Sequence, residues 1–205
     1  METDKIDENI SQFKLDLLNE KLSIDDIIKK YIMLGTPYIF KDNEHQHYEL
    51  LRKIAGFFNI SERDVFIVGS SKLGFSISPK KLWNKIDWNE DEDSDIDVVV
   101  ISDKTFDRYW KSILEYKDKQ IPMTKDEKRH SEFLEYFFKG WIRPDKFPNK
   151  YNGADEWFEF FRSISYKENF GGRKVAVAIY KEEYFFMKYH KENLQYIKKI
   201  LNSNT

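Results

Sequence analysis

A Gly-Ser turn that follows a short apolar run is the first part of the sequence whose residue types could bind a ligand. The run 65–68 (VFIV) predicts a buried strand that ends at Gly69. A glycine lets backbone N–H groups approach an anion closely, and the hydroxyls of Ser70 and Ser71 are further donors. A helix starting near Ser71 also favours an anion at its N-terminus. We therefore expect this turn to bind phosphate through Gly69, Ser70, Ser71 and Lys72, with a solvated Lys72 as the alternative.

An Asp-x-Asp motif opens the next β-branched run of the chain, which extends from residue 96 to 101. Residues i and i+2 of a strand point to the same side, so Asp95 and Asp97 direct two carboxylates at one region. Hard oxygen ligands of this kind suit Mg²⁺, and Mn²⁺ can take its place. Metal ions held in this way activate an attacking hydroxyl and stabilise a leaving pyrophosphate. Asp95 and Asp97 are the predicted metal ligands and catalytic residues.

Two basic residues, Arg173 and Lys174, follow the turn Gly171-Gly172 and precede a third β-branched run. They are placed to hold a triphosphate or an acceptor strand. A hairpin turn with solvated basic side chains is the alternative. Further along, Trp141 and Arg143 are candidates to flank a base or simply to pack, and His190 is expected at the surface or in a cap.

Hydrophobic periodicity and capping residues predict the elements that position these side chains. The pattern is that of an α+β fold, with a small mixed sheet flanked by N- and C-terminal helices. We expect one domain over 1–205, with N-terminal helices in 1–60, a catalytic core in 61–120, and helices, a third strand and the closing helix in 121–205. The expected helices are 1–20, 23–34, 43–58, 105–119, 125–141, 157–164 and 182–201, and the expected strands are 65–68, 96–101 and 174–180.

Composition excludes several classes of function. The chain of 205 residues has no cysteine, which rules out a disulfide scaffold, a thiol nucleophile and a zinc ribbon. Its 34 basic and 36 acidic side chains give a net charge of −2, so there is no basic field for nonspecific binding of duplex DNA. Neither a secretory signal nor an apolar run of about 18 residues is found. We expect a cytoplasmic protein with no membrane partner.

In order and type, these motifs resemble those of the DNA polymerase β-like nucleotidyltransferase superfamily, in its minimal bacterial form. The signature is an apolar strand, Gly-Ser, a spacer, and Asp-x-Asp on a strand, and the resemblance covers about residues 62–103. It implies a mixed-sheet palm, an NTP or dNTP whose triphosphate lies on Gly69 and Ser70, and a metal held by Asp95 and Asp97. It also implies transfer of a nucleotide to a hydroxyl with release of pyrophosphate.

The chain departs from this superfamily in two places. The spacer 71–94 is longer than usual and holds the acidic run 90–93, interpreted as a solvated loop. Asp95 and Asp97 are preferred over the acids of that run because only they lead directly into a strand. The superfamily often has a third carboxylate on a neighbouring strand, where this chain has Ala176 and Ala178. The candidates to substitute for it from elsewhere in the chain are Glu182, Asp145 and Asp155, and the alternatives are a two-carboxylate enzyme or a pseudoenzyme.

The resemblance implies a template-independent enzyme that makes a nucleotide signal or oligomer in bacterial anti-phage defence. The alternatives are AMP-type modification of a protein or RNA in a toxin–antitoxin pair, and a nucleotide-binding pseudoenzyme. The implied partners are an NTP or dNTP, a single-stranded nucleic acid or protein acceptor, and an effector or toxin protein.

Overall fold

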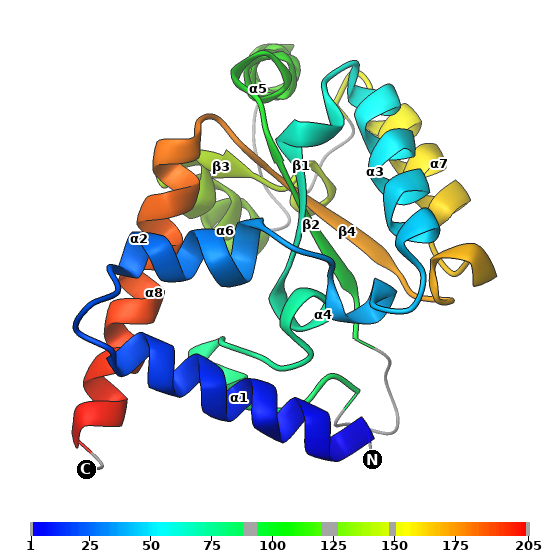
Figure 1. The fold of residues 1–205 in the computed structure, drawn as a ribbon. Coiled ribbons are helices and arrows are strands. Elements are labelled where there is room, and N and C mark those ends of the chain that lie inside the picture. Colours follow the sequence, from blue (N-terminus) through cyan, green and yellow to red (C-terminus); the bar gives the residue numbers. More distant parts are fainter. Residues whose placement is uncertain (1, 88–93, 120–126, 148–150, 204–205) are drawn as a thin grey trace.

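The computed structural model describes residues 2–87, 94–119, 127–147 and 151–203, and it has the mixed α+β architecture that the sequence predicts (Figure 1). The strands are β1 (Val65–Val68), β2 (Ile96–Ile101), β3 (Trp141–Ile142) and β4 (Val175–Tyr180). The helices are α1 (Glu2–Leu18), α2 (Ile24–Ile27) continued by a π-helix (Ile28–Met33), α3 (Glu44–Phe58), α4 (Gly69–Leu73), α5 (Asp103–Lys119), α6 (Glu127–Phe138), α7 (Ala154–Ile164) and α8 (Glu183–Ser203).

The four strands form one mixed sheet in the order β1-β2-β4-β3. The strand β2 pairs antiparallel with β1 and parallel with β4, and β3 pairs antiparallel with β4. In this register Asp97 of β2 lies beside Val68 on one side and Ala176 on the other. The start of β2 therefore meets both the end of β1 and the start of β4.

Alternation along the strands divides the core between the two faces of the sheet. Val175, Val177 and Ile179 are buried on one face, against side chains of α3, α5 and α7. Val99 and Tyr180 are buried on the other face, against α1, the α2–π-helix segment and α8. Odd-numbered positions of β2 share the second face, so Asp95 and Asp97 belong to the side covered by α1 and α8.

The first part of the long spacer is folded rather than free. It doubles back after α4, with Ser76 N–H donating to the Asn84 carbonyl at 2.8 Å and Trp83 N–H donating to the Ser76 carbonyl at 2.8 Å. Phe75 is fully buried, with its ring 5.5 Å from that of Phe13 in α1. The acidic run 90–93 lies outside the described residues.

One expected helix ends early. We predicted a helix to about residue 141, but α6 ends at Phe138, and Trp141 and Ile142 form β3 opposite Tyr180 and Ile179 of β4. Gly140, with a φ of +78°, takes a left-handed conformation that ends a helix. A strand of two residues has too few positions for an alternating pattern, which explains why the sequence did not reveal it. Among the described helices, none has the length and apolar character needed to cross a membrane.

Candidate functional site

The turn between β1 and α4 lies directly against the Asp-x-Asp motif. Gly69 begins α4 with a φ of +69°, which glycine adopts readily and other residues rarely do. A Cβ atom on Gly69 would lie 2.9 Å from Oδ2 of Asp97, closer than side chains tolerate. Glycine at position 69 therefore suits the backbone conformation, and a larger residue there would displace the Asp97 carboxylate oxygen.

Asp97 is a largely buried carboxylate, and burial raises its pKa from 3.8 to about 6. The positive charges of Arg143, Lys174 and Lys81 act in the opposite direction, and the negative charge of Asp95 adds to the rise. Within the described residues, no hydrogen bond or ion pair is made by the Asp97 side chain. An anion that is mostly shielded from water and has no partner is energetically unfavourable, and a bound cation would compensate it.

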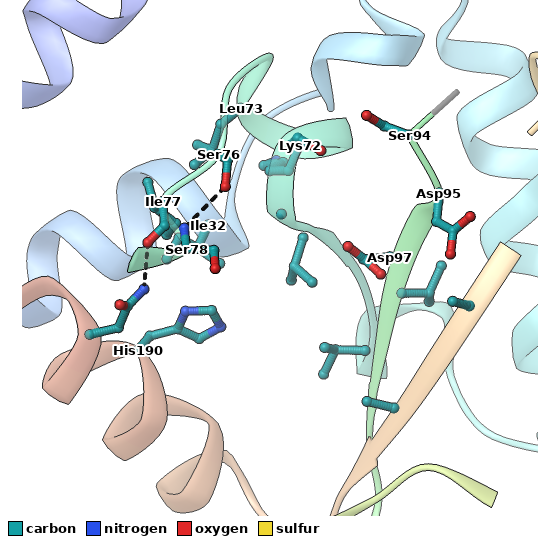
Figure 2. A pocket seen from close by; sticks show the side chains of 18 of the residues that line it. Ile32, Lys72, Leu73, Ser76, Ile77, Ser78, Ser94, Asp95, Asp97 and His190 are labelled. Atoms are coloured by element: carbon teal, nitrogen blue, oxygen red, sulfur yellow. Dashed lines mark hydrogen bonds between the residues drawn. The ribbon is translucent and has the colours of Figure 1, made fainter. Parts of the chain in front are cut away.

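Asp95 has a different environment from Asp97. Its carboxylate is half-exposed, and Lys174 Nζ lies 3.1 Å from its Oδ2. Figure 2 shows the Asp97 carboxylate turned toward the β1–α4 turn, whereas Asp95 lies nearer the start of β4. Both carboxylates line one pocket.

The pocket has a volume of about 540 Å³ and extends from the two aspartates to helix α8. Near the ends of the strands it is charged, with Lys81 and Arg143 in its lining beside the aspartates. Across the pocket from Asp97, Figure 2 places His190 of α8. The pocket thus has one charged side and one side formed by a helix with uncharged residues in the lining, which are Tyr189, His190 and Asn193.

The four residues of the predicted phosphate turn divide into two groups. Gly69 and Ser70 line the pocket. Ser71 is fully buried and its Oγ donates to the Val68 carbonyl at 2.9 Å, so this hydroxyl stabilises the turn instead of facing the pocket. Lys72 is also buried, contrary to the solvated alternative, although part of its side chain lines the pocket.

The ammonium group of Lys72 connects α4 to the end of the π-helix. It donates to the carbonyl oxygen of Leu34 at 2.6 Å and to that of Gly35. Burial lowers the pKa of Lys72 to about 8. These contacts give Lys72 a structural role that its sequence position did not indicate.

Arg173 and Lys174 also separate in space. The Arg173 guanidinium forms a two-point ion pair with Asp87 of the spacer, with distances of 2.6 and 2.5 Å, and donates to the Ser94 carbonyl at 3.1 Å. Asp87 in turn accepts the Ser94 N–H at 2.9 Å. Arg173 thereby fixes the end of the spacer at the start of β4. Neither Arg173 nor Lys174 lines the pocket, but Lys174 pairs with Asp95, which does.

The strand positions at which the superfamily often has a third carboxylate hold alanines that face the pocket, as the sequence indicated. Ala176 is the register partner of Asp97 in β4, and both Ala176 and Ala178 line the pocket. Among the described residues, no group of three or more acidic or histidine side chains is arranged to hold a metal.

Of the possible substitutes for that carboxylate, Asp145 is connected to the site. It is paired with Arg143 at 2.8 Å, and Arg143 lines the pocket. Glu182 and Asp155 are exposed, and Asp155 is on α7 over the opposite face of the sheet.

The expectation for His190 was wrong. It is 7% exposed, not a surface or cap residue, and it lines the pocket. The signal was present in the sequence, since Phe186, His190 and Leu194 recur at intervals of four and form the buried stripe of α8. A histidine within an apolar stripe was assigned by its residue type instead of by its position.

Comparisons with known proteins gave no match, whether to protein-family models, to curated protein sequences or to solved structures. The function is therefore inferred from the residues of the pocket and their geometry.

Proposed function

We propose that this protein is a Mg²⁺-dependent nucleotidyltransferase, which moves a nucleotide from an NTP or dNTP to a hydroxyl group and releases pyrophosphate. The observation that supports this most strongly is the largely buried Asp97 carboxylate, which lies against Gly69, makes no ion pair with the described residues and comes two residues after a second carboxylate. A structural aspartate in this position would be expected to have an ion-pair or hydrogen-bond partner.

The residues of the pocket fit a divalent cation. Asp97 and Asp95 supply carboxylate oxygens, the ligand type that Mg²⁺ prefers, and the open pocket leaves room for substrate phosphates and water as the remaining ligands. Mg²⁺ bound there would neutralise phosphate charge and make the α-phosphorus more electrophilic. Mn²⁺ would serve in the same way.

The chain itself contributes mainly position and charge to the reaction. Gly69 allows a phosphate to approach the backbone, and the Ser70 hydroxyl is a donor at the same place. Lys81 and Arg143 supply positive charge from the pocket lining. The acceptor oxygen forms a bond to the α-phosphorus, the bond between that phosphorus and the bridging oxygen breaks, pyrophosphate leaves with that oxygen, and the hydroxyl proton passes to water.

A nucleotide-binding pseudoenzyme is the second candidate. Ala176 beside Asp97 favours it, because the strand next to the carboxylate pair supplies no third acidic ligand. The proposed product of the active enzyme, a nucleotide signal or oligomer for anti-phage defence, and its alternative, AMP-type modification of a protein or RNA, rest on the resemblance alone.

The test is to incubate the full chain with each labelled NTP and dNTP in Mg²⁺ or Mn²⁺ and to measure pyrophosphate and labelled product. We expect activity with at least one nucleotide, abolished in both Asp95→Ala and Asp97→Ala. Asp155→Ala removes an exposed carboxylate from the other face and is the matched control. Activity that persists in Asp97→Ala would overturn the proposal. A wild type that binds nucleotide but transfers none would establish the pseudoenzyme.

A further inference from the structure

The side of the pocket formed by α8 and β3 has a chemistry of its own. The residues that α8 contributes to the lining are Tyr189, His190 and Asn193, all uncharged, and β3 contributes Trp141. Apolar side chains, among them Ile32 and Ile77, complete this wall. A phosphate would find no cation among these residues, whereas a flat, uncharged, polar group fits them.

His190 is the first sign that a ligand completes this wall. Its side chain is more than nine-tenths buried, and its Nδ1 has no hydrogen-bond partner in the described part of the chain. Figure 2 shows the ring directed from α8 into the pocket. The ring is held by edge contacts with Phe186 at 4.5 Å and Tyr189 at 5.1 Å between centroids. Burial lowers the pKa of His190 to about 4, so the imidazole is neutral at physiological pH.

Trp141 is a second, independent sign. Its indole Nε1 is buried and also lacks a partner among the described residues. The indole stacks with Tyr136 at 4.2 Å and with Tyr180 at 5.6 Å between ring centroids. Tyr189 lies edge-on to the indole at 6.1 Å, and the N–H group is the polar part of Trp141 that has no hydrogen bond. Two unsatisfied buried nitrogens in the lining of one pocket are unusual in a folded protein, because leaving such groups unpaired costs free energy.

We propose that the α8 side of the pocket is a nucleobase subsite, in which His190 and Trp141 hydrogen-bond the polar edge of a base while its phosphates extend toward Gly69 and Asp97. This assignment rests on the proposed function for the identity of the ligand as a nucleotide. A base is flat, uncharged and rich in donors and acceptors. Neutral His190 offers a donor or an acceptor according to its tautomer, and Trp141 offers a donor.

The experiment separates the base from the phosphates. Adenosine, guanosine, cytidine, uridine and inorganic tripolyphosphate are titrated into the wild type by calorimetry in Mg²⁺. The same titrations are made with His190→Phe and His190→Gln. His45→Phe, which changes an exposed histidine of α3, is the matched control. We expect one nucleoside to bind the wild type best and to lose about tenfold in affinity in His190→Phe, as for one lost hydrogen bond. Tripolyphosphate affinity should stay within about twofold, and His190→Gln should recover part of the loss.

The proposal is overturned if no nucleoside binds the wild type, if His190→Phe binds the preferred nucleoside unchanged, or if it loses nucleoside and tripolyphosphate equally while folded. Should His190→Phe not fold, the imidazole ¹⁵N resonances of wild-type His190 provide the test, because they must shift with the nucleoside and not with tripolyphosphate. The binding of a nucleoside can be measured whether or not the protein transfers nucleotides, so the two proposals can be tested separately. If the protein binds a base through His190 but transfers no nucleotide, the nucleobase subsite is retained and the proposed enzyme activity is rejected. If His190→Phe transfers nucleotides with unaltered base preference, the enzyme activity is retained and the subsite is rejected.

Discussion

Replacing Asp97 by Asn removes a charge that is only partly exposed to water while nearly preserving the shape of the side chain. In the metal-free protein, the pKa of Asp97 is about 6 instead of 3.8, a difference of about 2 pKa units. At 1.36 kcal/mol for each unit, the charged form costs the fold up to about 3 kcal/mol relative to the neutral form. The magnitude already includes the opposing charges of Arg143, Lys174 and Lys81 and the like charge of Asp95.

The sign follows from proton binding. Because the folded pKa is raised, the folded protein binds more protons than the unfolded chain between about pH 4 and pH 6, and its stability falls as pH rises through that window. Asp97→Asn does not titrate and should gain up to about 3 kcal/mol over the wild type between pH 4 and pH 7. His190 has the opposite effect, because its pKa is lowered to about 4 and its contribution rises with pH. The wild type and the variant share His190, so their difference isolates Asp97.

The measurement is urea unfolding of both proteins in EDTA at pH 4, 5, 6 and 7, with the free energy of unfolding taken at each pH. Asp155→Asn, at an exposed position, is the control and should show no such trend. In a parallel series, Mg²⁺ should raise the midpoint of the wild type and leave that of Asp97→Asn unchanged. A difference between the two proteins that stays flat with pH, or that moves against the variant as pH rises, would refute the argument that Asp97 is buried without compensation.

Three other outcomes follow from particular contacts. Gly69→Ala should lose about 1–3 kcal/mol of stability in urea unfolding, because alanine is strained in a left-handed backbone conformation, and it should also lose all transfer activity. Gly153 has the same backbone conformation with open space around it, so Gly153→Ala should lose stability alone. A double-mutant cycle of Asp87→Ala and Arg173→Ala should give a coupling free energy of about 1–2 kcal/mol, and a value near zero would show that the pair does not fix the spacer. Because burial lowers the pKa of Lys72 to about 8, the wild type should gain stability relative to Lys72→Met as pH rises from about 8 to about 10, and a difference in melting temperature that stays flat over that range would contradict this.

Local patterns were sufficient to predict the parts of the fold that depend on neighbours in the sequence. The β-branched runs at 65–68 and 96–101 have the bounds of β1 and β2, and the alternation along β4 correctly assigned Ala176 and Ala178 to the face opposite Val177. The two aspartates could be placed on one face because a strand repeats every two residues.

Pairings over long sequence distances could not be predicted in this way. Lys72 binds a carbonyl 38 residues away, and Arg173 binds Asp87 at a separation of 86 residues. Residue type gave the same prediction, phosphate binding, for both side chains, but their partners are set by how α4 and β4 pack in the fold. His190 was missed for a different reason, since its periodic position indicated burial and its polarity suggested exposure.

The place of β2 inside the sheet determines where ligand binding can be observed by hydrogen exchange. With β1 on one side and β4 on the other, the backbone of β2 is hydrogen-bonded along both edges. Its amides should therefore exchange with solvent only when the whole sheet opens, and their protection factors should report the global free energy of unfolding. A cation that binds Asp97 in the folded protein should slow exchange along all of β2 to the same extent.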